Sequence, residues 1–339
     1  MRIVTIRDVA EKAGVSISTV SRVLNERMDV DPETRERVLS VIAKLHYVRN
    51  NNARNLKQRH TDFIAIILHG RRNIFLTDIA ERMLEYGKET SCQFLLEFID
   101  EKADEFRAAR RLYMERKLSG VIFLGSNISG REKDIVQLDL PCVFSTIEAS
   151  SLKIPKVCSV SVDNRKGGMD ATDRLFALGH KRIAVAGYQW EHNDGTGQRF
   201  SGAMDSYKKH GDVFDKSLFI HSDFTLKGAY DATISMLEKT RDFTAVFAIS
   251  DTIAIGVIRA LVDHGLQVPK DVSVIGFDGI ELASYITPSL ATMRQPMDDI
   301  AKLSVSLLID SIQGKPTRHV LLDTEPVMGD SVRPLNIGM

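Results

Sequence analysis

The sequence predicts an α/β protein with a small all-α unit at its N-terminus. From about residue 63 onward, short apolar runs alternate with amphipathic segments at helical spacing, which is typical of parallel sheets covered by helices on both faces. The first 45 residues instead place their apolar side chains at helical spacing. A length of 339 residues also favours two or three folded units over one.

Two short helices open the chain, and Gly14 supplies the turn between them. Thr5 can cap the first helix and Ser16 can cap the second. Each helix has one apolar face, formed by Ile6, Val9, Ala10 and Ala13 in the first and by Val20, Val23 and Leu24 in the second. Two helices joined in this way form a helix-turn-helix, whose second helix enters the major groove of double-stranded DNA.

A third helix is predicted to begin at Asp31, with Asp31 as N-cap and Pro32 at the first helical position. It is expected to complete a small core with apolar residues at helical spacing, namely Val38, Leu39, Ile42 and Leu45. Residues 1–49 are therefore predicted to form a DNA-binding domain.

The outer side of the second helix carries side chains suited to reading DNA. Ile17 can contact a thymine methyl, Ser18 can bond a base edge, and Arg22 can reach guanine or phosphate. Phosphate contacts that set the register are expected from hydroxyl side chains, with an amide close by: Thr5, Ser16, Thr19, Ser21 and Asn25. For Thr5 and Ser16, a purely capping role is the alternative.

Charge is unevenly distributed along the chain, although the formal net charge is zero. Residues 1–60 contain 12 Lys and Arg against 7 Asp and Glu, so the remaining residues carry the compensating excess of acid. A basic head on an acidic body suits contact with a polyanion at one end only, although a solvated surface would account for the same few charges.

Residues 50–59 are polar and basic and contain a single leucine, Leu56. So short and polar a segment is expected to become ordered only against a partner. Leu56 is suited to act as a wedge between base pairs in the minor groove. Packing of Leu56 on the core of the head is the alternative.

Nine apolar runs of the body are predicted as strands. Because this number is large for a single sheet, two lobes are expected, with a ligand bound in a cleft at the C-terminal ends of the strands. The runs are Phe63–Leu68, Phe94–Ile99, Val121–Leu124, Cys142–Ser145, Val157–Val162, Ile183–Ala186, Ala245–Ile249, Val272–Phe277 and Leu290–Met293. Polar side chains at strand ends are the expected ligand contacts, namely Ser126, Ser250, Asp251 and Asp278. The two aspartates could instead be helix N-caps, and the single tryptophan, Trp190, could stack on a sugar ring or cover a helix.

The motifs from Thr5 to Asn25, from Asp31 to Arg35 and from Ala53 to Leu56 resemble the lac repressor (LacI/GalR) family, and the likeness extends over nearly the whole chain. The resemblance implies a ligand-responsive transcription repressor that binds a palindromic operator as a homodimer. It implies that residues 50–61 form a hinge helix in the minor groove, with Leu56 as the intercalating residue. The polar residues Asn50 and Arg54 and the small Ala53 are then also DNA contacts.

The resemblance also implies a two-lobed body, 62–339, similar to periplasmic sugar-binding proteins. Its first lobe would comprise about 62–162 and 289–323, and its second about 163–288 and 324–339, with crossings near Asp163, Pro288 and Asp323. By resemblance the cleft would include Asn73 and Phe75 from one lobe and Arg199 and Phe224 from the other. Phe75 could instead belong to the core of its lobe. Arg199 is expected just before an amphipathic helix.

The ligand itself stays open at this point. A sugar or sugar derivative is expected, while Arg71 and Arg72 near the cleft allow an anionic effector and could equally be surface charge. The same DNA-binding role could be regulated by a purine-like or protein corepressor, and neither the sign of the response nor the operator sequence can be read.

Other function classes are disfavoured. No Walker, HExxH or GxSxG motif occurs, and Gly195-Thr196-Gly197 is only a weak fragment of a nucleotide-binding loop, so neither an enzyme nor a cofactor or metal is expected. No apolar run has the length of a membrane span, and no signal peptide is recognised. Cys92, Cys142 and Cys158 have no metal-site spacing and are predicted to be reduced thiols of a cytoplasmic bacterial protein.

Overall fold

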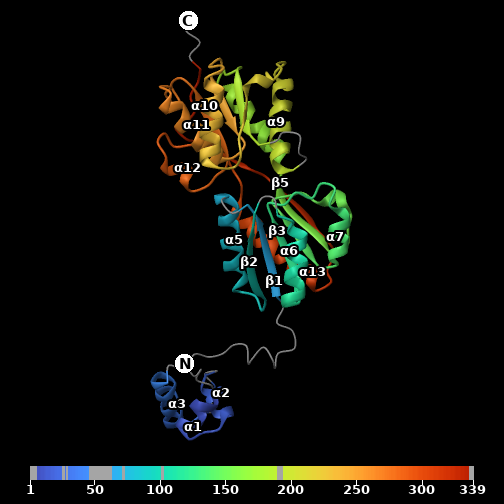
Figure 1. Cartoon of the computed structure of the whole chain (residues 1–339), viewed down its shortest axis with the longest axis vertical. Helices are drawn as coiled ribbons and strands as arrows, with labels where there is room; N and C mark the ends of the chain where they lie inside the picture. The colour runs from blue at the N-terminus through green and yellow to red at the C-terminus, as the bar shows by residue number, and fades with distance from the viewer. Residues whose placement is uncertain are drawn as a thin grey trace. The chain divides into compact units, whose positions relative to one another are not determined.

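The computed structural model describes residues 6–24, 27, 30–45, 63–70, 73–100, 103–188 and 194–335. The chain divides into two units, an N-terminal head (1–61) and a body (62–339), shown in Figure 1. Among the DNA and ligand residues expected from sequence, seven lie outside the described residues: Thr5, Asn25, Asn50, Ala53, Arg54, Leu56 and Trp190.

The head contains α1 (Ile6–Ala13), α2 (Ile17–Leu24) and α3 (Pro32–Lys44). The predicted turn is confirmed, because Gly14 has a φ of 65°, a conformation that favours glycine. The predicted cap is confirmed as well, since the Asp31 carboxylate accepts a hydrogen bond from the backbone N–H of Thr34. Residues from all three helices form the core, including Val9, Val20 and Val38.

One core residue of the head was predicted wrongly. Leu39 is 48% exposed, whereas its neighbour Val38 is fully buried. Successive residues of a helix point about 100° apart, and with Val38 directed at the centre of the core, Leu39 is turned toward solvent. The apolar face of α3 continues instead through Val41, Ile42 and Leu45, which are half-buried against the core.

The first lobe of the body is built on a six-stranded sheet, in the order β11-β5-β4-β3-β1-β2, in which every pairing is parallel. Its strands are β1 (Phe63–His69), β2 (Gln93–Ile99), β3 (Leu118–Leu124), β4 (Cys142–Ser145), β5 (Val157–Val162) and β11 (His319–Leu322). Alternate residues of β1 enter two different cores: Ile64 and Ile66 pack with α5 (Ile74–Gly87) and α13 (Met297–Ile312), while Ile67 packs with α6 (Glu105–Arg116) and α7 (Glu132–Leu138). Helices therefore cover both faces, as predicted.

The second lobe has its own six-stranded sheet, in the order β12-β10-β9-β8-β6-β7. Its strands are β6 (Ile183–Gly187), β7 (Phe219–His221), β8 (Ala245–Ala248), β9 (Ser273–Asp278), β10 (Ala291–Arg294) and β12 (Glu325–Val327). Only β12 runs antiparallel to its neighbour. The helices are α8 (Asn164–Ala177), α9 (Gly195–Lys209), α10 (Leu226–Leu237), α11 (Asp251–Asp263) and the short α12 (Leu282–Tyr285), and two 3-10 turns (Ser150–Leu152, Lys216–Leu218) complete the body.

The chain passes between the two sheets at three points, and one of them differs from the expectation. β10 had been expected in the first lobe, after a crossing near Pro288. Instead it pairs with β9, with Ala291 opposite Ile275, so the crossing follows Arg294. Because the side chains of Ala291, Thr292 and Met293 are all buried, the strand has to be covered on both faces, and the second sheet provides this.

Helix α9 lies unusually close to α8, and this fixes the position of Arg199. A Cβ atom added to Gly168 would lie 2.1 Å from the carbonyl oxygen of Arg199, and one added to Gly202 would lie 1.9 Å from that of Arg165. The two glycines therefore permit backbone contact between the helices. No helix in the described part of the chain is long and apolar enough to cross a membrane.

Candidate functional site

The head presents a polar surface on the outer side of α2. Ile17, Ser18 and Arg22 are exposed, whereas Val20 and Val23 of the same helix are buried. The Ser16 hydroxyl accepts a hydrogen bond from the backbone N–H of Thr19 and lies 2.7 Å from the Ser18 hydroxyl. Ser16 thus caps α2, which is the alternative role considered for it. Because its hydroxyl is exposed, it can also contact a phosphate. Thr19 and Ser21 are half-buried on the flanks of the helix.

The body contains a cavity of about 320 Å³ between the two lobes, at the C-terminal ends of the strands. Seven of the nine predicted ligand residues line it: Asn73, Phe75, Ser126, Arg199, Phe224, Ser250 and Asp278. Trp190 is outside the described residues, and Asp251 lies behind the cavity wall. Three of these residues were expected from their position at strand ends and four from the family resemblance, so the fold brings both sets together.

Arg199 is the centre of the wall formed by the second lobe. It is 6% exposed, and its guanidinium lies 3.8 Å from the ring centroid of Phe277. Nε donates to Asn164 Oδ1 at 2.8 Å, and Nη1 donates to the carbonyl oxygen of Ile249 at 2.7 Å and to Asp278 Oδ1 at 3.0 Å. Because Gly195–Lys209 is helical, Arg199 lies within α9 and not before it, which corrects the expectation.

Asp278 ends β9 with a φ of 116°, a strained conformation for a residue other than glycine. Its Oδ1 also accepts from Gln295 Nε2 at 2.8 Å, so the carboxylate joins Arg199 to the segment that crosses between the lobes. Burial raises the pKa of Asp278 to about 6, and Arg199 opposes that shift. Strained, buried and charged residues of this kind concentrate at binding sites.

Asp251 supports the site from behind. It is fully buried, and its carboxylate accepts from the backbone N–H groups of Gly279 and Ile280 and from the Thr292 hydroxyl. Burial, followed by the nearby charge of Asp278, raises the pKa of Asp251 to about 8. Asp251 is thus the carboxyl group of this cluster that most readily keeps its proton, and it holds the loop that follows Asp278.

The helix N-cap role that was considered for Asp251 is played by its neighbour Ser250. Ser250 is the N-cap of α11, because its hydroxyl accepts from the backbone N–H of Ile253, and Asp251 is the first residue of that helix. Asn73 caps α5 through its Oδ1 atom and still lines the cavity. Phe75 is 4% exposed, so it belongs to the core of the first lobe and at the same time forms part of the cavity wall.

Sequence reasoning missed several lining residues, among them His69, Tyr188, Asp194 and Thr196. His69 ends β1 and Tyr188 directly follows β6, so the strand-end rule would have found both. Tyr188 and Phe224 form an aromatic wall, with ring centroids 6.0 Å apart. Gly195 and Thr196, which had been compared with a nucleotide-binding loop, form the first turn of α9 below its cap, Asp194.

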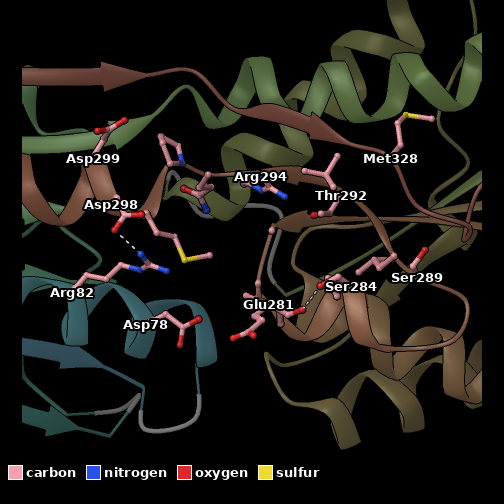
Figure 2. Close-up of a pocket in the computed structure, with 18 of the residues that line it drawn as sticks. Asp78, Arg82, Glu281, Ser284, Ser289, Thr292, Arg294, Asp298, Asp299 and Met328 are labelled. Atoms are coloured by element: carbon pink, nitrogen blue, oxygen red, sulfur yellow. Dashed lines mark hydrogen bonds and ion pairs between the residues drawn. The ribbon is translucent and has the colours of Figure 1, made fainter.

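A larger cavity of about 870 Å³ lies elsewhere between the lobes (Figure 2). Asp78 and Arg82 of α5 lie on one side of it and Glu281 and Ser284 on the other. Arg82 is paired with Asp298, and both side chains are largely exposed. Among the residues that the structure describes, no predicted ligand residue and no aromatic side chain lines this cavity. The smaller cavity is therefore the better candidate for a ligand site.

Comparison with known proteins agrees with both units. The family described as "Bacterial regulatory proteins, lacI family" matches residues 5–50, and "Periplasmic binding protein-like domain" matches residues 172–332. The HTH-type transcriptional regulator MalR of Clostridium butyricum is 34% identical over 96% of this chain and 98% of its own length. Catabolite control protein A of Priestia megaterium is 31% identical over 90% of this chain and 91% of its own. The structure of a transcriptional regulator CelR–cellobiose complex matches with a TM-score of 0.71 and 29% identity, covering 97% of this chain and 99% of that one.

Proposed function

The chain belongs to the lacI family of bacterial regulatory proteins, and we propose that it is a repressor of transcription whose affinity for DNA depends on a small molecule. The repressor binds a palindromic operator as a homodimer, with one α2 in each half-site. The proposal depends mainly on one combination of features. The folded head exposes the polar face of α2, and the body that follows contains a preformed cavity. Ile17, Ser18 and Arg22 read bases, and Thr5, Ser16, Thr19, Ser21 and Asn25 position the helix on phosphates.

The segment 50–61 is the second DNA contact in this proposal. Leu56 enters the minor groove at the centre of the operator, where Asn50, Ala53 and Arg54 accompany it. Replacing Leu56 with Ala is expected to weaken operator binding while leaving ligand binding unchanged. Equal operator affinity of the two proteins in a fluorescence anisotropy titration would exclude Leu56 from the interface. The control is Gln58→Ala, which truncates a neighbouring side chain of the same segment without changing its charge.

The effector is a sugar or a sugar derivative. A cavity with aromatic side chains on one wall and buried, hydrogen-bonded polar groups at its end suits a molecule with many hydroxyl groups. The similar regulator CelR forms a complex with cellobiose, which is consistent with this class of ligand. Ligand changes the relative stability of two lobe arrangements, and the arrangement decides whether two heads fit one operator.

The test is a thermal-shift screen of the full chain against sugars, sugar acids, sugar phosphates and purines. We expect a sugar or a derivative of one to raise the melting temperature and to change operator affinity in a separate titration. If only a purine has both effects, the effector is a purine-like corepressor and not a sugar. If no compound acts while a purified protein partner changes operator affinity, the small-molecule part of the proposal fails.

A further inference from the structure

Two buried amide side chains, Asn164 and Gln295, connect the ligand cavity with the segments that cross between the lobes. Arg199 lines the cavity, whereas Asn164 and Gln295 lie behind it. Asn164 is 7% exposed and Gln295 is 2% exposed. Each stands at a crossing, since Asn164 begins α8 directly after β5 and Asp163, and Gln295 directly follows β10. Burying an amide is costly unless it is hydrogen-bonded, so the partners of these two side chains show what they hold together.

The first connection leads from Arg199 to the crossing after β5. Arg199 Nε donates to Asn164 Oδ1 at 2.8 Å. Asn164 Nδ2 donates to the carbonyl oxygen of Val162 at 3.2 Å and lies 3.4 Å from Ser161 Oγ. Ser161 and Val162 are the last residues of β5, in the first lobe, whereas Arg199 belongs to the second. One amide group therefore joins the arginine of the cavity to the sheet of the other lobe.

The second connection leads from Arg199 to the crossing after β10. Asp278 Oδ1 accepts from Arg199 Nη1 at 3.0 Å and from Gln295 Nε2 at 2.8 Å. The backbone N–H of Gln295 also donates to the carbonyl oxygen of Asp278 at 2.9 Å. Gln295 is followed by Pro296, the N-cap of α13, which packs in the first lobe. A single carboxylate oxygen is thus shared between the cavity and the segment that enters the first lobe.

The third crossing, at Asp323, is held in a different way. Lys166 Nζ donates to Asp323 Oδ1 at 2.9 Å, and the two side chains are 50% and 81% exposed. In the described part of the chain, no side chain that bonds to Arg199 also bonds to Asp323. An exposed ion pair contributes little to stability, so this crossing provides a natural comparison for the other two.

The two connections should respond together to a ligand. A ligand acceptor that draws the guanidinium of Arg199 toward the cavity lengthens its bonds to Asn164 and Asp278. Because both partners are almost fully buried, neither can exchange the lost bond for one with bulk water. A small displacement at a binding site can be amplified in this way into a change between two packed arrangements.

We infer that Asn164 and Gln295 are positioning residues of the effector response, which link Arg199 to two of the three crossings so that ligand binding changes the angle between the lobes. The inference rests on the proposed function, since it concerns the response to a ligand of that same cavity. Ligand binding and the response of DNA binding should then be separable, because both residues lie outside the lining of the cavity.

Two variants each break one connection on the side away from Arg199. Gln295→Met keeps the length of the side chain and removes its donor to Asp278, while the three hydrogen bonds of Arg199 stay in place. Asn164→Asp keeps an acceptor for Arg199 Nε and removes the donor to β5. The control Asp323→Asn removes the exposed ion pair at the third crossing. Because the two variants change different crossings, the test does not depend on either one folding.

The first experiment needs no ligand. Pulsed EPR measures the distance between spin labels attached to Met114→Cys in the first lobe and Val213→Cys in the second, which are 80% and 84% exposed. The full chain carries Cys92→Ser, since the other two cysteines are buried, and labelled protein is diluted with unlabelled protein so that only distances within one chain count. We expect one narrow distance distribution in the labelled parent and in Asp323→Asn, and a broader or shifted one in Gln295→Met and Asn164→Asp. Identical distributions in all four proteins would overturn the inference.

The second experiment uses cellobiose and D-glucose as probes, with calorimetry for probe binding and fluorescence anisotropy for binding to an operator selected from a random-sequence pool. In the wild type, a bound probe should change operator affinity by about 5- to 150-fold, the usual range for coupling between two sites, and in the two variants by less than about threefold. The variants should still bind the probe as the wild type does.

The separation of binding from response distinguishes coupling from a merely structural role. A full response in both variants would contradict the inference, and so would loss of probe binding together with the response, because Asn164 and Gln295 would then build the site itself. Absence of binding by both probes to the wild type would count against the sugar-binding function, whereas the EPR measurement would still decide the role of the two amides.

Discussion

The exposed face of α2 in the head and the smaller cavity between the lobes are both proposed to bind polar partners, but they hold their polar groups in opposite ways. Ser18 and Arg22 are exposed on a helix whose core lies on its other side, whereas Arg199 is 6% exposed and donates three hydrogen bonds to protein acceptors. Groups on the head are solvated until DNA arrives, while those of the cavity are already desolvated and oriented. Binding and stability should therefore be separable in the head and coupled in the cavity.

The largest effect is expected at Arg199. Arg199→Ala leaves the Asp278 carboxylate and the Ile249 carbonyl without their donor, and removing one partner of a buried ion pair typically costs about 3–5 kcal/mol. The variant should also lose its response to the effector while keeping the wild-type affinity for DNA. Urea unfolding followed by circular dichroism measures the first effect, and an operator titration with and without effector measures the second.

The matched control is Arg165→Ala. Arg165 belongs to the adjacent helix α8 and pairs with Asp205, but its side chain is 58% exposed. Exposed ion pairs contribute about 0–1 kcal/mol, so this variant should stay close to the wild type. Equal losses of stability in the two variants would show that burial does not distinguish the pairs, and the contrast between head and cavity would lose its basis.

A pH dependence should follow from the buried carboxyl groups. Burial raises the pKa of Asp251 to about 8, whereas an unfolded aspartate titrates near pH 4. Between these values the folded protein keeps a proton that the unfolded chain has released. The free energy of unfolding therefore falls as pH rises from about 4 to about 8, by up to about 1.4 kcal/mol per pH unit from this group.

Asp251→Asn isolates that contribution because an amide cannot ionise. Urea unfolding between pH 5 and pH 8 should show a shallower loss of stability for this variant than for the wild type. Asp299→Asn, at an exposed position, should retain the wild-type slope. Parallel curves for the wild type and Asp251→Asn would mean that Asp251 is ionised throughout the range.

The same contrast explains which features could be predicted from sequence. Turn and cap signals are local, so Gly14 and Asp31 were predicted correctly, and long buried strands such as β1 show continuous apolar runs. The edge strands β7, β11 and β12 were missed because they have three or four residues and mixed exposure. Leu39 was misplaced because an apolar residue beside a buried one looks the same in sequence whether it faces the core or water.

In the cavity, residue type and strand-end position were enough to predict Ser126, Ser250 and Asp278, whereas Arg199 was predicted from the family resemblance. These two signals could not distinguish a residue that lines the cavity from one that lies behind it and holds the lining residues in place. Asp251 and Asp278 both follow apolar runs, yet only the fold shows that Asp251 is turned toward the loop at Gly279 and Ile280. Glu105, whose buried carboxylate accepts a hydrogen bond from Ser126, gave no signal, because it is the first residue of a helix and meets Ser126 only through the packing of α6 beside β3.

The smallest effect on stability is expected in the head. Arg22→Ala should leave the free energy of unfolding within about 0.5 kcal/mol of the wild type, because Arg22 is exposed. Its affinity for operator DNA should fall by about 1–3 kcal/mol, the range for a side chain that reads a base. Arg37→Ala, on the exposed side of α3, is the control and should change affinity less. Comparable losses in the two variants would show that α2 has no special part in reading DNA.

Selection of DNA from a random-sequence pool by the full chain tests the central claim most directly. The account predicts that the wild-type protein enriches an inverted repeat, since two copies of α2 read two half-sites, and that binding weakens steeply as salt is raised. Arg22→Ala should fail to enrich that repeat, or should relax its preference at one position of each half-site. Enrichment of no sequence by the wild type, or of the same repeat to the same degree by Arg22→Ala, would contradict the assignment of α2 as the DNA-reading helix.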